Sequence, residues 1–183
     1  MRTALALSLF FAPSLASATV VMNMTRAEMT DLSSQVVRAR VGSIRTVEER
    51  PGALATLIEL EVLETYRGKS TPGDVLTMMQ MGGKIGDFVQ SIPGQSVFTP
   101  GEEVVLFLSA FGDRYVQVGI GLGRFVVERS ADGVIAREDL GDVTFASAGK
   151  DGVVRIGAKP KAARLWLRDL AAELRSYQQR EVR

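Results

Sequence analysis

The most regular feature of the chain is an alternation of apolar and polar residues in two neighbouring segments. Between residues 35 and 48, and again between residues 54 and 66, apolar side chains recur at every second position over much of the segment. A period of two residues is typical of a strand with one buried face and one solvated face. A Pro-Gly turn separates the two segments, so we predict a hairpin. Its polar face would place two basic residues opposite two acidic ones, namely Arg38 and Arg40 opposite Glu59 and Glu61.

Shorter apolar segments along the rest of the chain predict further strands. Residues 103–110 (EVVLFLSA) are almost continuously apolar, which is typical of a strand buried on both faces. The other predicted strands are residues 74–81, 114–119, 123–129 and 134–138, with shorter candidates at 143–145 and 153–156. Many short strands separated by frequent turns predict a mainly β fold, either an antiparallel barrel or a sandwich.

Two segments predict helices, one near each end of the domain. Thr25 is followed three residues later by Glu28, the spacing of a capping box, which predicts a short helix over residues 26–33. Near the C-terminus, Pro160 stands where a first helical residue is often proline. The apolar residues after it recur at helical spacing and would form one stripe: Ala163, Trp166, Leu167, Leu170, Leu174 and Tyr177. We predict a C-terminal amphipathic helix over about residues 160–178 that packs on the β domain.

Residues 82–102 break the strand pattern, because Gly and Pro are scattered through GGKIGDFVQSIPGQSVFTPGE. A connection longer than about 15 residues is uncommon in a compact domain unless it is functional or structured. Loops on a rigid scaffold often carry binding residues, and an aromatic side chain among glycines and polar groups suits recognition. We therefore predict a binding site at Gly82, Gly83, Lys84, Asp87, Phe88 and Gln90. The alternative is a structured crossover in which Phe88, Val89 and Ile92 close one end of a barrel.

The first eighteen residues have the pattern of a secretory signal peptide. Arg2 supplies a positive charge, an apolar run follows over residues 4–12, and small residues at 16–18 form a cleavage site. The apolar run is much shorter than the roughly 20 residues that a membrane span needs. We expect cleavage after Ala18, a single domain over residues 19–183, a periplasmic or secreted location, and no transmembrane segment after cleavage.

The composition removes several classes of function. The chain has no histidine and no cysteine, which excludes Ser-His-Asp and Cys-His triads, His or Cys zinc sites and thiol redox chemistry. We therefore expect no metal and no cofactor. The chain has 22 Lys and Arg against 21 Asp and Glu, and loss of Arg2 with the signal peptide would leave equal numbers. A neutral protein lacks the positive field that attracts nucleic acids, so we expect no nucleic-acid partner.

Paired carboxylates are a catalytic device that needs neither histidine nor cysteine, as in glycosidases. The acidic residues that stand out in the pattern are Glu59, Glu61, Glu102, Glu103, Asp132 and Asp139. They lie on the predicted outer faces of strands or in turns, where we expect them to be solvated. The sequence therefore favours a protein that is not an enzyme, with a carboxylate-based hydrolase as an alternative.

The order of features between Glu28 and Val127 is distinctive. A short helix is followed by strands such as VVRARVGSI and ATLIELEVLETYRGK, a GG-containing loop, PGEEVVLFL and RYVQVGIGLGRFVV. This order resembles a group of uncharacterised exported bacterial proteins and, more remotely, the netrin-like domains of tissue inhibitors of metalloproteinases. The resemblance implies an OB-like barrel, a fold that binds ligands across one face and its loops. Those inhibitors use an N-terminal cysteine to ligate the protease zinc, whereas the expected mature N-terminus here is Thr19-Val20-Val21.

These expectations together describe a non-enzymatic binding or assembly module of the bacterial envelope. A small barrel with helices would present residues 82–102 to a protein or glycan partner. Two alternatives stay open: an inhibitor or accessory factor of an exported protease, and the carboxylate-based hydrolase.

Overall fold

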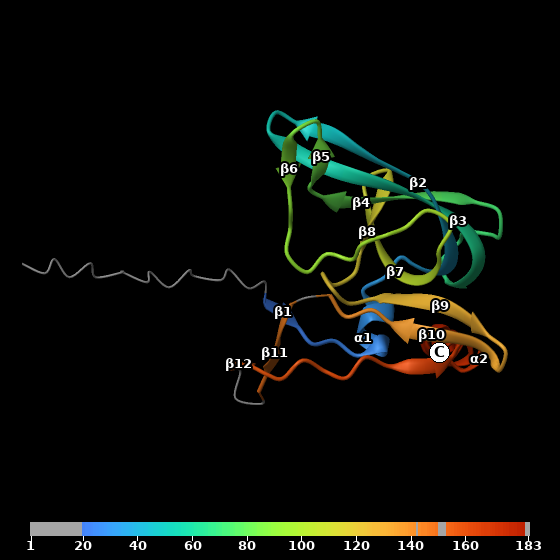
Figure 1. The fold of residues 1–183 in the computed structure, drawn as a ribbon. Helices are drawn as coiled ribbons and strands as arrows, with labels where there is room; N and C mark the ends of the chain where they lie inside the picture. Colours follow the sequence, from blue (N-terminus) through green and yellow to red (C-terminus); the bar gives the residue numbers. More distant parts are fainter. Residues whose placement is uncertain (1–19, 142, 150–152, 182–183) are drawn as a thin grey trace, which may run out of the picture.

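The computed structural model describes residues 20–141, 143–149 and 153–181, and their fold is mainly β (Figure 1). The predicted signal peptide, residues 1–18, and its cleavage site lie outside these residues. The helices are α1 (Arg26–Asp31) and α2 (Leu167–Glu181). The strands are β1 (Val20–Met22), β2 (Gln35–Arg50), β3 (Ala53–Arg67), β4 (Val75–Met81), β5 (Gly83–Ile85), β6 (Phe88–Gln90), β7 (Glu103–Phe111), β8 (Arg114–Gln117), β9 (Arg124–Ser130), β10 (Gly133–Glu138), β11 (Thr144–Ala148), β12 (Val154–Ile156) and β13 (Arg164–Trp166).

The largest sheet contains a ring of five strands. Its order is β13-β10-β9-β7-β2-β3-β4-β8, and β8 also pairs with β7, so β2, β3, β4, β8 and β7 follow one another around a ring. The pairings around the ring are antiparallel except for the parallel bridge from β4 to β8 at Met78 and Tyr115. The predicted β2–β3 hairpin and the strands predicted from residue 74 to residue 138 are confirmed.

The polar face of the β2–β3 hairpin matches its predicted charge pairs only in part. Arg40 lies opposite Glu61, and their side chains form an ion pair of 3.1 Å. With Arg40 opposite Glu61, antiparallel pairing places Glu59 beside Gly42 and not opposite Arg38. The register then shifts between Arg38 and Ala39, so Arg38 lies opposite Glu64. A bulge of this kind adds a residue on one strand and so changes which side chains meet.

Alternate residues of the ring strands point into a shared apolar interior, the ring core. Its buried residues are Val37, Ala39, Val41, Ile58, Leu60, Val62, Met78, Phe98, Val104, Leu106 and Leu108. Phe98 comes from the connection between β6 and β7. The crossover prediction expected Phe88, Val89 and Ile92 to close the barrel, but Phe88 and Val89 are exposed and Phe98 is the aromatic residue buried in this core.

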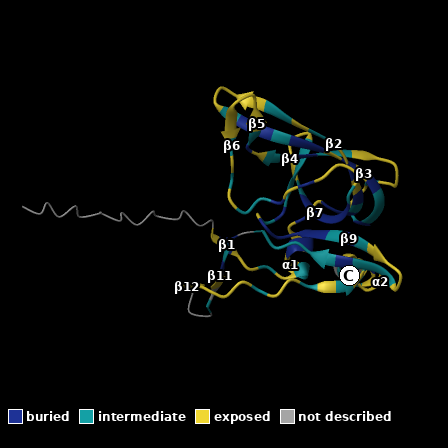
Figure 2. Ribbon diagram, viewed as in Figure 1, coloured by how far each residue is buried: buried dark blue, intermediate teal, exposed yellow. Residues whose placement is uncertain are grey.

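A second apolar region, the outer core, lies on the other face of β7 and β9. There β9, β10 and β13 extend the sheet, and α1, α2 and a small sheet of β1, β11 and β12 cover it (Figure 1). The larger buried residues of the outer core include Met29, Tyr66, Phe107, Phe125, Phe145, Leu170 and Leu174. Figure 2 shows buried residues along β7, where the ring meets this second region, and exposed residues on the β5–β6 hairpin.

The two helices differ in how well the sequence predicted them. In α1 the Thr25 hydroxyl accepts a hydrogen bond from the Glu28 amide, and the Glu28 carboxylate accepts one from the Thr25 amide at 2.7 Å, as the capping box predicts. The backbone bond from Thr25 is the main cause that lowers the pKa of Glu28. In contrast, α2 begins at Leu167 and not near Pro160.

The predicted start of the C-terminal helix is wrong because the chain first adds a strand to the sheet. Arg164, Leu165 and Trp166 form β13 and pair with Arg137, Ala136 and Ile135 of β10. Sheet pairing satisfies the backbone groups of these residues and overrides their helical spacing. Among the described residues, no helix is long and apolar enough to cross a membrane.

Candidate functional site

The predicted binding residues lie on a small hairpin beside the tip of the β2–β3 hairpin (Figure 1). Strands β5 and β6 pair antiparallel, with Ile85 opposite Phe88 and a turn at Gly86 and Asp87. Lys84, Asp87 and Phe88 are exposed on it, and 53% of the Phe88 surface is accessible. The structure therefore places these three residues where a partner can reach them.

The other three predicted residues hold the base of this hairpin. The Gly82 amide donates to the Leu54 carbonyl at 2.7 Å, and the Leu54 amide donates to the Gln90 side-chain oxygen at 2.8 Å. Gly82 has φ +90°, and a Cβ there would lie 2.5 Å from the Gln90 carbonyl oxygen. A Cβ on Gly83, at φ +141°, would lie 2.5 Å from Thr46. Gly82, Gly83 and Gln90 thus position the hairpin, and the Gln90 oxygen is already bonded.

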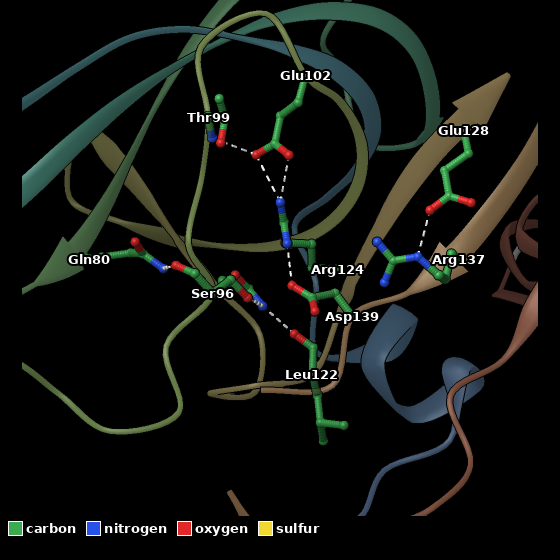
Figure 3. Close-up of polar contacts among 10 residues, drawn as sticks. Gln80, Ser96, Thr99, Glu102, Leu122, Arg124, Glu128, Arg137 and Asp139 are labelled. Atoms are coloured by element: carbon green, nitrogen blue, oxygen red, sulfur yellow. Dashed lines mark hydrogen bonds and ion pairs between the residues drawn. The ribbon is translucent and has the colours of Figure 1, made fainter. Parts of the chain in front are cut away.

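The chain between the hairpin and β7 is fixed by polar contacts from β4 and β8 and by a hydrogen bond within the loop (Figure 3). The Gln80 amide donates to the Ser96 carbonyl at 3.2 Å, and the Gln117 amide donates to the Ser96 hydroxyl at 3.3 Å. Further along, the Glu102 carboxylate accepts a hydrogen bond from the Thr99 amide at 2.8 Å. The loop is therefore an ordered connection, bonded to β4 and β8.

Arg124 of β9 is the centre of this polar cluster (Figure 3). It is only 4% exposed, and its Nη2 lies 2.8 and 2.7 Å from the two carboxylate oxygens of Glu102. Its Nη1 donates to Asp139, and its guanidinium carbon lies 4.7 Å from the centre of the Phe98 ring. This arginine joins the loop to β9 and holds Phe98 in the ring core.

The acidic residues considered for catalysis divide into two groups. Glu59, Glu61 and Asp132 are exposed, as expected. The expectation of solvation is wrong for Glu103, which is 7% exposed and bound by Arg38 and Arg129, and Glu102 and Asp139 are half-buried on Arg124. Long-range pairing explains the error, because arginines distant in sequence compensate the cost of burying each charge. These carboxylates are engaged in ion pairs and do not face each other across an open cleft.

Large apolar side chains are exposed around the end of β4, and we call this surface the Met81 face. Met81 lines three adjoining hollows of about 150, 400 and 370 Å³. The first also includes Ile120, the second Phe111, and the third Val89 and Val97. Ile85 and Phe88 are also exposed, at the tip of the β5–β6 hairpin, but they line none of the three hollows. We include them in the Met81 face, which comprises Met81, Ile85, Phe88, Val89, Val97, Phe111 and Ile120.

Charged residues line the hollow of about 400 Å³, which we call the middle hollow of the Met81 face. Glu49 and Arg50 come from the β2–β3 tip, and Asp113 and Arg114 from the β7–β8 turn. Arg114 donates to Glu49, and this hydrogen bond is the main cause that raises the pKa of Arg114. The ion pair connects the two strand tips and leaves Phe111 and Met81 exposed between mixed charges.

Sequence reasoning found part of this surface and missed the rest. The apolar run of β7 extends past residue 110 to Phe111 and stops at Gly112-Asp113, which indicates an apolar side chain next to a turn. The contribution of Met81 depends on how β4 ends against two hairpins, which the sequence pattern does not reveal.

Comparisons with family models, with curated proteins and with solved structures returned no match.

Proposed function

We propose that this protein is an exported, non-enzymatic binding module of the bacterial envelope that docks a protein partner on the Met81 face. The observation that carries the proposal is the gathering of exposed Met, Ile, Val and Phe side chains around three adjoining hollows. Single exposed apolar residues are normal, but a contiguous group with a polar rim is typical of an interaction site. The core of a protein interface has the same character, apolar in the centre and polar at the edge.

The chemistry of the Met81 face favours a protein over a glycan. Sugar hydroxyls need several hydrogen-bonding groups to replace water, whereas the centre of this face consists of thioether, aliphatic and phenyl groups. Methionine adapts its shape to apolar partners, and Phe and Met are enriched in protein interfaces. The mixed charges of Glu49, Arg50, Asp113 and Arg114 would set the orientation of a partner at the rim.

We also infer that the five-stranded ring is an OB-like barrel. Its order, with the third strand (β4) parallel to the fifth (β8) and the first (β2) antiparallel to the fourth (β7), supports this inference. OB-folds bind ligands with the loops after the first and fourth strands. The corresponding turns here are those of β2–β3 and β7–β8, and both border the middle hollow of the Met81 face.

The rigid base of the β5–β6 hairpin supports recognition without a large ordering cost. The bonds of Gly82 and Gln90 to Leu54 fix the hairpin before a partner arrives. Binding surfaces that are already ordered lose less conformational entropy on association. The inhibitor and hydrolase alternatives gain no comparable support: β1 pairs with β11 in the other half of the molecule, and the buried carboxylates lie in ion pairs.

The test is a photo-crosslinking capture from the native envelope, followed by binding measurements on the purified partner. The tagged mature protein carries a crosslinking amino acid at Ile85, and its Kd for the captured protein is compared with that of Phe88→Ser/Phe111→Ser. We expect an affinity loss of at least about tenfold, as at interface centres. The matched control is Val20→Ser/Ile156→Ser, which changes exposed apolar residues of the small sheet and should bind normally.

Three results would overturn the proposal. The first is capture of no protein by a folded sample. The second is an equal loss of affinity in the control. The third is a crosslinked homodimer with a matching dimer in solution, because the occupant of the face would then be a second copy of this chain.

A further inference from the structure

Helix α2 lies at the end of the molecule away from the β5–β6 hairpin (Figure 1). A hollow of about 500 Å³ lies beside this helix. It is bounded by α2, by the turn between β9 and β10, and by residues of β2 and β3. Its volume is within the range of small-molecule sites. It has no residue in common with the Met81 face, so the inference below does not rest on the proposed function.

One wall of this hollow carries two guanidinium groups on α2. Arg168 and Arg175 are seven residues apart, on the same face of the helix and about 10 Å apart along its axis. Ala171 lies between them, and its small side chain leaves space between the two arginines. Their side chains are 81% and 53% exposed, so both can turn toward a ligand.

The floor of the hollow is an ion-pair cluster around Glu64. Its carboxylate pairs with Arg38 at 3.2 Å and with Arg175, and it accepts a hydrogen bond from the Tyr66 hydroxyl at 3.1 Å. Burial, and then the charge of Glu64, raises the pKa of Tyr66, which keeps that hydroxyl a donor. The lining has three arginines, Glu64 and Asp132, and two of the arginines have a further acidic partner: Arg38 pairs with Glu103 at 2.8 Å and Arg168 with Asp169 at 3.5 Å.

The remaining wall is apolar and ordered. Trp166 packs on Gly133, where a Cβ would lie 2.9 Å from the indole ring, and the Arg168 guanidinium lies 5.7 Å from the centre of that ring. Val134 and Leu167 complete this wall. The hollow therefore combines two solvent-exposed guanidinium groups with a fixed indole and aliphatic groups.

We propose that this hollow binds an organic monocarboxylate with an apolar body, either a free acid or the C-terminal residue of a peptide. Guanidinium groups bind carboxylates through paired charge-assisted hydrogen bonds. Because these arginines already have acidic partners, the hollow suits the single negative charge of a carboxylate better than the nearly two negative charges of a phosphate monoester. The apolar body packs against Trp166, Val134 and Leu167, and the carboxylate lies between Arg168 and Arg175.

Trp166 supplies the readout for a test, because it is the only tryptophan in the chain. The mature protein is titrated with N-acetyl-leucine, with N-acetyl-leucinamide, and with the tripeptide N-acetyl-Ala-Ala-Leu, while Trp166 fluorescence and calorimetric heat are recorded. We expect saturable binding of both acids and at least about tenfold weaker binding of the amide, which lacks the charge. A preference for the tripeptide identifies a peptide terminus, and equal affinities identify a free acid.

Variants connect the signal to the two arginines. Arg168→Gln and Arg175→Gln, made separately, should each weaken binding of N-acetyl-leucine about five- to tenfold. Arg45→Gln changes an exposed arginine of β2 outside the hollow and removes the same charge, so it should bind normally. Equal binding of the amide, equal weakening by Arg45→Gln, or no saturable change by fluorescence and calorimetry would overturn the proposal.

Discussion

Replacing Arg124 with alanine removes the cation that two carboxylates share near the ring core. Arg124 is 4% exposed, and the side chains of Glu102 and Asp139 are 17% and 30% exposed, so water can only partly compensate for the loss. Breaking a buried ion pair by removing one partner typically costs about 3–5 kcal/mol. We expect Arg124→Ala to lower the free energy of unfolding by about 3–5 kcal/mol, a large part of the stability of an ordinary domain.

Urea unfolding followed by circular dichroism measures this loss. The matched control is Arg40→Ala, which breaks the exposed pair with Glu61 and should cost less than about 1 kcal/mol. Glu102→Gln in the Arg124→Ala background should recover part of the loss, because it removes one of the uncompensated charges. A cost for Arg124→Ala similar to that of the control would refute the reasoning, since it would show that these carboxylates are well solvated.

Three further substitutions test the positioning elements and one ion pair. Gly83→Ala places a Cβ against Thr46 at a left-handed φ and should lower the free energy of unfolding, measured in urea, by about 1–3 kcal/mol. Gly86→Ala is the control: its Cβ would have open space around it, so the loss should be smaller. Equal losses would contradict the close packing at Gly83. Phe98→Ala should cost about 3–5 kcal/mol, and a loss below about 1 kcal/mol would show that Phe98 does not fill the ring core. Burial tends to raise the pKa of Glu173, but the hydrogen bonds from Arg26 and Tyr177 prevail and lower it. Glu173 therefore stabilises the fold above its unfolded pKa, and this stability is lost as pH falls through its folded pKa. Thermal unfolding should show Glu173→Gln less stable than wild type at pH 7, with the gap shrinking below about pH 4.5; a gap that does not depend on pH would contradict this assignment.

The elements defined by local patterns were predictable from the sequence. The capping box of Thr25 and Glu28 forms within four residues, and the alternation in β2 and β3 depends only on which face is buried. Residues 164–166 were misassigned because their spacing also fits a helix, and only the presence of β10 alongside favours a strand. Element type is therefore predictable where local preference and tertiary contacts agree.

The candidate site was only partly predictable for the same reason. Phe88 and Lys84 were predicted as binding residues because an aromatic and a charged residue stand among glycines in an irregular segment, and the structure shows that both are exposed. The arginine partners of Glu102 and Glu103 lie at least 22 residues away, so nothing nearby in the sequence indicates their burial. Likewise, Met81 borders the hollows of the Met81 face only because the tips of two hairpins meet at the end of β4.

Strand β7 has a consequence for how the molecule folds, because its alternate residues belong to different cores. Val104, Leu106 and Leu108 face the ring core, and Val105 and Phe107 face the outer core. A chain shortened to the ring alone would expose Val105 and Phe107 to water, and the helical half without β7 would lose the sheet on which it packs. The two halves therefore share their stability, and we expect the described domain to form and to melt as one cooperative unit.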